Sequence, residues 1–357
     1  MKMEMSNLRS GGSAELRGKL VAQLLRDAWK MRTTPTTLST EELDEISTVA
    51  LRSGTAALAW NSLRNSELSK SKAAQQFRQA YLSDSIQAAL SQHHLKRVIS
   101  LLRSGGVEPL LVKGWAVARL YPELGFRPYC DLDLCVAPED YSTAKAVLQD
   151  SNVEIAVDLH AGFEKFYDRN IDDILGRSEL VKLDDVEVRV LGPEDNLRFL
   201  CLHLLRHGAT RPIWLCDTGV LLQNSATNFD WDLCLTGSQR EVNWIVSALE
   251  LGHQLLGIDL EGMPRSKRPR ALPGWFVPAV LKEWGRPYHS RRIVAGYLRY
   301  PIGLFKDLGR HWPNAIEATM TVQGPINGLP RLPFQVGHLV SRTSALITQL
   351  AERPGKA

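Results

Sequence analysis

The chain has 357 residues, more than one compact hydrophobic core usually contains, so we expect two or three domains or subdomains. Hydrophobic residues make up 44% of the chain and the net charge is +4, which is typical of a globular protein and does not by itself indicate nucleic-acid binding. No apolar run approaches membrane-spanning length, the first residues do not resemble a secretion signal, and no cysteines form a Cys-x-x-Cys pair, so we expect a reduced, cytoplasmic protein without a membrane partner.

The first part of the chain is expected to be almost wholly helical, over residues 14–103. Ser39 and Glu42 have the spacing of a capping box, which marks the start of a helix. A longer helical pattern runs from about Ala73 to Arg103 and ends at two glycines. We therefore predict an N-terminal helical region, residues 1–104, which packs on the later part of the chain and carries no chemistry of its own.

The stretch from Leu110 to Val136 reads as a strand, a glycine turn, a short helix, a loop and a second strand. The second strand carries Asp131 and Asp133, and residues two apart in a strand project from the same face. Two neighbouring carboxylates repel each other, so the arrangement needs a reason. The commonest reason is a divalent cation held by oxygen ligands, usually Mg²⁺.

A third acid occurs on a later strand. We expect a helix from Pro138 to about Gln149 and then a strand from Val153 to Leu159, in which Asp158 lies on the more polar face with Glu154 and His160. Glu154 is an alternative third ligand, and we interpret His160 as a structural residue. Another short strand is expected at Val186–Val190.

Long helical patterns then begin at Pro193 and continue towards the C-terminus. The predicted fold is α+β, with a small mixed sheet in residues 105–192 between the helical region 1–104 and a C-terminal helical domain, residues 193–357. We expect the helical regions to wrap the sheet and form an acceptor cleft beside it.

The three acids suggest a metal-dependent reaction. If their strands are neighbours, Asp131, Asp133 and Asp158 can converge on one patch and hold metal ions together with a polyphosphate. Asp158 can also help to deprotonate an attacking hydroxyl. This donor set suits in-line transfer at a phosphorus atom.

The residues before the acidic strand suit a phosphate group. Gly114, between a strand and a helix, lets a phosphate approach backbone N–H groups. Lys113 and Arg127 can neutralise phosphate oxygens. Two alternatives stay open: Lys113 could be a solvated lysine at the end of a strand, and Arg127 could form an ion pair with Asp131 or Asp133.

The helix after Pro193 raises two further questions. His203 and His207 are four apart, the spacing of a zinc pair, but leucine stands where the HExxH pattern requires glutamate, so we expect no zinc there. Asp217 lies in an apolar helix, and it could reach a nucleotide or form an internal ion pair. We expect the internal pair, with Arg206 or Arg211.

Several short motifs occur in a fixed order along the chain: Lys113-Gly114, Tyr121-Pro122, Arg127-Pro128, Asp131-Leu132-Asp133, Asp158-Leu159-His160, Pro193-Glu194-Asp195, His203 and Trp214-Leu215-Cys216-Asp217. In this order they resemble the nucleotidyltransferase superfamily that includes DNA polymerase β and the aminoglycoside nucleotidyltransferases. Within that superfamily the chain closely resembles a bacterial family of largely uncharacterised nucleotidyltransferases. The chain departs from the wider pattern at Trp115, where a small residue is usual.

The resemblance implies a Mg²⁺-dependent enzyme that moves a nucleoside monophosphate from an NTP, with ATP as the expected donor, and releases pyrophosphate. It implies metal binding by Asp131, Asp133 and Asp158, and nucleotide binding by Lys113, Gly114 and Arg127. The acceptor is a hydroxyl or side chain of a small molecule, peptide or protein, and we do not expect nucleic acid. The alternative is a catalytically idle nucleotide-binding or protein-interaction module on the same fold.

Overall fold

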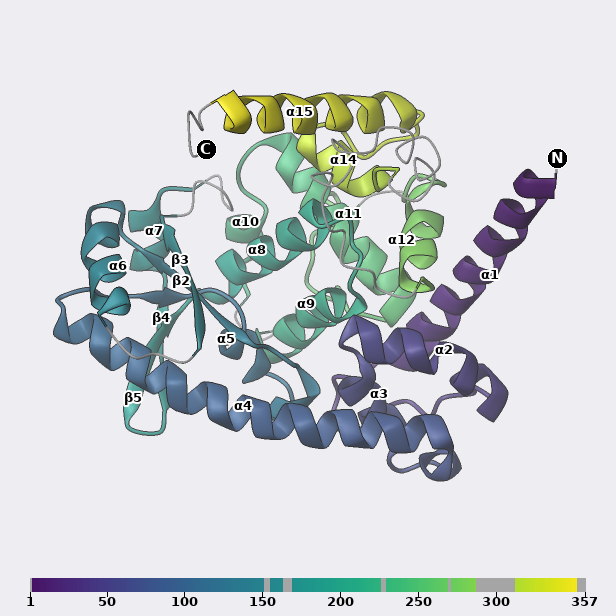
Figure 1. Ribbon diagram of the computed structural model, residues 1–357, viewed down its shortest axis with the longest axis horizontal. Helices are drawn as coiled ribbons and strands as arrows, with labels where there is room; N and C mark the ends of the chain where they lie inside the picture. The colour runs from purple at the N-terminus through teal and green to yellow at the C-terminus, as the bar shows by residue number, and fades with distance from the viewer. Residues whose placement is uncertain are drawn as a thin grey trace, which may run out of the picture.

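The computed structural model describes residues 2–150, 155–162, 169–225, 229–268, 271–286 and 312–351. Within these ranges the protein is α+β, as predicted, with a mixed sheet of five strands at one end and helices from both halves of the chain beside it (Figure 1). Among the helices that the structure describes, none is both long and apolar enough to cross a bilayer.

The N-terminal helices are α1 (Lys2–Leu25), α2 (Thr40–Ser53), α3 (Ala56–Leu63), the 3₁₀ turn η1 (Glu67–Lys70) and α4 (Lys72–Ser104). The predicted capping box is confirmed: the Glu42 N–H donates to Ser39 Oγ at 3.2 Å, and the Ser39 N–H donates to Glu42 Oε2 at 2.9 Å. The long helix α4 runs under both α3 and the sheet (Figure 1). It therefore connects the N-terminal helices to the strands.

The sheet has the strand order β3-β2-β1-β5-β4. Its strands are β1 (Leu110–Leu111), β2 (Asp131–Val136), β3 (Ala156–Ala161), β4 (Glu179–Leu183) and β5 (Val186–Val190). β2 pairs with β3 in parallel and with β1 antiparallel, while β5 pairs with β1 in parallel and with β4 antiparallel. The predicted start of the third strand, at Val153, lies outside the described residues.

Strand β4 was missing from the sequence-based prediction. Within the described residues it is an edge strand whose only partner is β5, and four of its five residues are exposed or half-buried. A strand that is exposed along most of its length does not need alternating apolar and polar residues, because it has no face to bury. Its sequence therefore lacks the pattern from which strands are predicted. The hairpin turn that joins it to β5 places Asp184 at a positive φ of 54°.

The two faces of β2 differ as the alternation predicts. Leu132, Leu134 and Val136 belong to an apolar cluster that also contains residues of α4 and of α6 (Tyr141–Gln149). Cys135, on the other face, belongs instead to the larger cluster that extends into the C-terminal helices. Short segments complete this region: α5 (Trp115–Ala118), η2 (Leu124–Phe126), η3 (Pro138–Asp140) and α7 (Ile171–Gly176).

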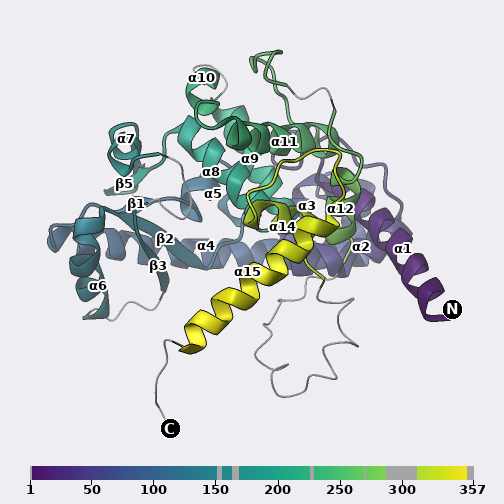
Figure 2. The same ribbon diagram turned by 90° about the horizontal axis from the view of Figure 1, so that it is seen from above.

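The C-terminal helices stack beside the sheet. They are α8 (Pro193–Arg206), α9 (Pro212–Ser225), α10 (Trp231–Cys234), α11 (Gln239–Leu256), α12 (Phe276–Trp284), α14 (Ala315–Thr321) and α15 (Leu332–Ala351). Figure 1 shows α8 and α9 between the sheet and α12. Figure 2 shows α15, in yellow, extending away from the other helices at the C-terminal end.

The first and the later helices of the chain meet at two glycines. A Cβ atom on Gly18 would lie 1.9 Å from the carbonyl oxygen of Leu281, and one on Gly285 would lie 1.7 Å from that of Ala14. α1 and α12 therefore pack backbone against backbone. The larger apolar cluster also includes residues from all three predicted regions, and the boundaries 1–104, 105–192 and 193–357 remain a prediction.

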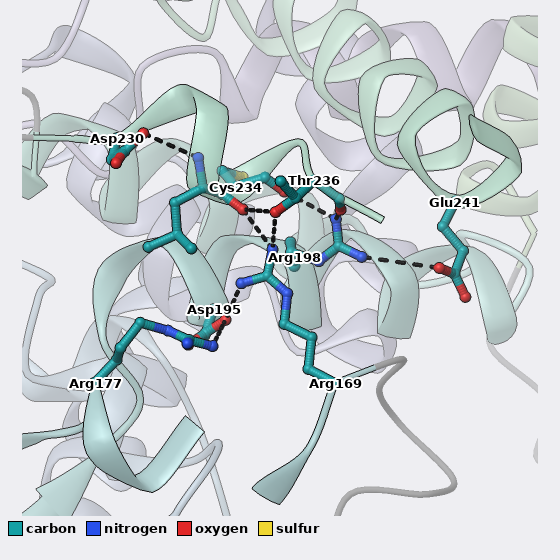
Figure 3. Close-up of polar contacts among 9 residues, drawn as sticks. Arg169, Arg177, Asp195, Arg198, Asp230, Cys234, Thr236 and Glu241 are labelled. Carbon is teal, nitrogen blue, oxygen red and sulfur yellow. Dashed lines mark hydrogen bonds and ion pairs between the residues drawn. The ribbon is translucent and has the colours of Figure 1, made fainter. Parts of the chain in front are cut away.

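A buried network of arginines holds α8 in place (Figure 3). Asp195, which is 1% exposed, accepts from Arg169 Nη1 at 2.6 Å and from Arg177 Nε at 3.0 Å. Arg198 Nη1 donates to the carbonyl oxygens of Cys234 at 2.9 Å and of residue 236 at 2.7 Å. A buried carboxylate needs such partners, so these contacts fix the start of α8 relative to α7 and α10.

Candidate functional site

Two of the predicted acids are direct neighbours in the sheet. Asp133 on β2 is the register partner of Asp158 on β3, and the strands are parallel, so both side chains project from one face. Asp133 is 3% exposed, whereas the Asp158 side chain is 62% exposed. Asp131 stands opposite Ala156 at the exposed start of β2. The predicted acidic patch requires the strands of Asp133 and Asp158 to be adjacent, and β2 and β3 are.

His160 joins these acids. One ligand atom each of Asp133, Asp158 and His160 lies within 4.8 Å of the others, a group that could hold a metal ion, and Asp131 is outside this group. Two carboxylates and an imidazole suit a divalent cation. Sequence reasoning interpreted His160 as structural. Its position two residues after Asp158, on the same face of the strand, was the signal that could have identified it.

Lys113 lies against the buried acid. Its Nζ is 2.6 Å from Asp133 Oδ1, and the two side chains are 18% and 4% exposed, so Lys113 is not a solvated lysine at the end of a strand. Burial raises the pKa of Asp133, Lys113 opposes that shift, and the charges of Asp131 and Asp158 add to it. In this structure the ammonium is thus the direct counter-ion of the buried carboxylate.

The glycine turn is required by the backbone. Gly114 has φ 60° and ψ −119°, a conformation that a residue with a Cβ rarely adopts. A Cβ there would also lie 3.3 Å from the carbonyl oxygen of Asp131. Trp115 packs into the apolar cluster with Leu132 and is 3% exposed. The Trp115 side chain therefore lies in the core, and its bulk does not occupy the turn at Gly114.

Arg127 forms a buried ion pair with Asp217. Arg127 Nε and Nη2 donate to the two carboxylate oxygens at 3.2 and 2.9 Å, and Tyr121 Oη donates to Oδ1 at 2.8 Å. Burial disfavours the charged guanidinium, but Asp217 outweighs it, so the pKa of Arg127 is raised. The expectation of an internal pair for Asp217 is confirmed.

The predicted partners of this pair were wrong. Asp217 binds Arg127 in place of Arg206 or Arg211, and Arg127 pairs with neither Asp131 nor Asp133. The reason is tertiary: α9 passes beside the loop that precedes β2, and the two residues are 90 positions apart in the chain. Nothing in the local sequence indicates that approach.

Two imidazoles at the end of α8 lie near the charge of Lys113 and pack against the Trp214 indole of α9. The ring centroid of His203 is 4.5 Å from that of His207 and 4.7 Å from that of Trp214. Burial, followed by the charge of Lys113, lowers the pKa of His203 well below its usual value, and the same two causes lower that of His207. Both imidazoles are therefore neutral neighbours of Lys113, and they lie outside the metal-capable group of Asp133, Asp158 and His160.

A family model described as an uncharacterised nucleotidyltransferase matches residues 39–160 and 149–244, more than half of the chain. The chain belongs to this family of uncharacterised nucleotidyltransferases. No curated protein and no solved structure matches it. The matched ranges contain the acids, Lys113, Gly114 and the rings at the end of α8. Family membership and the acidic cluster together support a transferase.

Proposed function

We propose that the protein transfers a nucleoside monophosphate from an NTP, with ATP as the expected donor, to an acceptor hydroxyl or side chain. An acceptor oxygen attacks the α-phosphorus, the bond to the β-phosphate oxygen breaks, and pyrophosphate leaves. The observation that carries this proposal is the placement of Asp133, Asp158 and Lys113 at one point of the sheet in a chain of this family.

The donor set fits a divalent cation, and we propose Mg²⁺. Asp131, Asp133 and Asp158 supply carboxylate oxygens, the ligands that Mg²⁺ prefers, and His160 supplies a nitrogen close to them. When bound, such an ion neutralises charge on the phosphate oxygens and favours the deprotonated acceptor. The proposal keeps Asp131 as a ligand, although it lies at the exposed edge of the cluster.

The chain's own residues have separate roles in this proposal. Lys113 donates to a phosphate oxygen, and the turn at Gly114, which has no side chain, lets that phosphate group approach the backbone. Asp158 is the more exposed of the paired acids, so we assign the acceptor to its side of the site. In this role the Asp158 carboxylate accepts the proton of the acceptor hydroxyl. Arg127, held by Asp217, contributes positive potential and fixes the loop before Asp131.

The test is pyrophosphate release by the full chain with each NTP and Mg²⁺, together with transfer of label from α-labelled ATP to components of a cell lysate. Fractionation by size then separates small-molecule acceptors from peptide or protein acceptors. Asp131→Asn combined with Asp133→Asn should abolish transfer while the circular dichroism spectrum stays unchanged. Glu139→Gln, an exposed acid just beyond β2, is the matched control and should keep full activity.

An unchanged rate of pyrophosphate release in the double variant would overturn the assignment. Calorimetry with each NTP, with and without Mg²⁺, distinguishes the enzyme from an idle binding module. Nucleotide binding that ignores Mg²⁺, combined with no transfer to any lysate component, would favour the idle module.

A further inference from the structure

The polar side chains of the acidic site fall into two parts. Asp131, Asp133 and Asp158 project from one face of β2 and β3, and His160 follows Asp158 on that face. One donor atom each of Asp133, Asp158 and His160 lies within 4.8 Å of the others, and these three residues are called the inner group. Asp131 lies outside it, at the exposed start of β2.

The spacing within the inner group suits direct ligands of one ion. His160 Nε2 is 3.2 Å from Asp158 Oδ2. Two neighbouring ligands of an octahedral ion are about 3 Å apart when each bond is about 2.1 Å long. Asp133 and Asp158 are register partners on parallel strands, and such strands lie about 4.8 Å apart. An ion between the two strands is therefore within reach of all three side chains.

Exposure and charge also fit a cation at this position. The side chains of Asp133 and His160 are 4% and 15% exposed, whereas that of Asp158 is 62% exposed. A cation can thus enter from the Asp158 side and meet two donors that are already held by the core. Three carboxylates, with Asp131 included, and the single ammonium of Lys113 leave negative charge uncompensated, and a divalent cation neutralises it.

The imidazole changes which cations the inner group favours. Mg²⁺ prefers oxygen ligands, whereas an imidazole nitrogen is a good ligand for first-row transition-metal ions. Within the described residues no cysteine joins the inner group, so it lacks the thiolates of many zinc sites. Its two carboxylates suit Mn²⁺ as well as they suit Mg²⁺. One nitrogen beside two carboxylates therefore favours an ion such as Mn²⁺ over Mg²⁺.

We propose that Asp133, Asp158 and His160 bind a divalent first-row transition-metal ion, of which Mn²⁺ is the type, through one nitrogen and two carboxylates. The Mg²⁺ of the proposed transferase then belongs between Asp131 and Asp133. Asp133 serves both positions, since a carboxylate has two oxygens. The inference rests on the proposed function, because it divides the metal site of that reaction between two kinds of ion.

The decisive measurement is the electron spin echo of Mn²⁺ bound to the full chain. A directly bound imidazole nitrogen modulates the echo, and an all-oxygen site does not. The natural chain should show nitrogen modulation, which should disappear in His160→Gln and persist in His93→Gln, the same change at an exposed histidine of α4. Bound Mn²⁺ without nitrogen modulation in the natural chain would overturn the proposal, and this result does not depend on whether a variant folds.

Ion preference gives an independent readout. Calorimetry should find that Mn²⁺ binds the natural chain about tenfold more tightly than Mg²⁺, because the imidazole favours the transition-metal ion. His160→Gln offers an amide oxygen in place of the nitrogen, so the ratio of the two affinities should fall towards one. His93→Gln should keep the natural ratio. An imidazole that only packs would leave the ratio unchanged, so equal ratios in His160→Gln and the natural chain would refute the ligand.

Two comparisons separate this proposal from the proposed function. Asp131→Asn should keep the nitrogen modulation, because Asp131 lies outside the inner group, and its loss would show that the two positions are one. Pyrophosphate release with Mg²⁺ tests the transferase by itself. Release with Mg²⁺ but no nitrogen modulation would overturn only the transition-metal position, and nitrogen modulation without transfer by any ion would overturn only the transferase.

Discussion

Arg127 and Asp217 form a two-bond ion pair that joins the loop before the acidic strand to helix α9, with donor–acceptor distances of 3.2 and 2.9 Å. The Asp217 side chain is fully buried, and that of Arg127 is 8% exposed. Tyr121 donates to the same carboxylate. The pair therefore sets the position from which β2 begins, and with it the direction of Asp131 and Asp133.

Removal of the arginine should be costly. Arg127→Met leaves Asp217 as a buried charge without its cation, which typically destabilises a protein by about 3–5 kcal/mol. Urea unfolding measures this, and Arg127→Met combined with Asp217→Leu should recover most of the loss. Lys19→Met, which breaks the exposed Lys19–Glu15 pair, is the control. A loss from Arg127→Met no larger than that of the control would mean that the ion pair is not structural.

Divalent ions should stabilise the protein through Asp133. A ligand that binds only the folded state raises its unfolding temperature, so Mg²⁺ or Mn²⁺ should do so in the natural chain. Asp133→Asn should remove most of that increase, because Asp133 is the buried member of the cluster. His160→Ala should reduce it, because the imidazole belongs to the same cluster, and Glu139→Gln should leave it intact. An equal increase in Asp133→Asn would contradict the metal site.

The contact between α1 and α12 should tolerate no side chain at Gly18. Gly18→Ala would force its Cβ against the carbonyl oxygen of Leu281, and overpacking of this kind costs roughly 1–3 kcal/mol. Gly176→Ala, also helical but with nothing within 4 Å of its Cβ position, should be neutral or slightly stabilising. Thermal unfolding compares the two variants. Equal stability would show that α1 is not held against α12.

Asp84 on α4 should make stability depend on pH. Burial raises its pKa from 3.8 to about 6. The folded protein thus binds the Asp84 proton more tightly than the unfolded chain does. This proton binding adds stability that is complete below the unfolded-state pKa and is lost as pH rises through about 6. After allowance for its partial exposure, we expect the loss to be roughly 1 kcal/mol.

Asp84→Asn should remove that slope and be the more stable protein at neutral pH. Denaturant unfolding at several pH values measures the difference, with Asp44→Asn, a change at an exposed acid of α2, as the control substitution. A constant difference between the natural chain and Asp84→Asn across the range would refute the shift.

Features that depend on residues close together in the sequence could be predicted. Contacts between residues far apart in the sequence could not. The capping box at Ser39, the faces of β2 and the glycine at 114 follow from local spacing and backbone geometry. The Arg127–Asp217 pair and the Gly18 contact arise only when helices pack. The neighbouring positions of β2 and β3 had to be assumed, because sequence alone does not specify strand order.

The Lys113–Asp133 contact has a thermodynamic consequence. Each partner occupies a group that an incoming ligand needs: the metal needs the carboxylate, and a phosphate needs the ammonium. Binding of either ligand loosens the contact and frees the group that the other requires. Coupling between two ligands is reciprocal, so metal and nucleotide should each bind more tightly in the presence of the other, and the empty site should resist loading by either one alone.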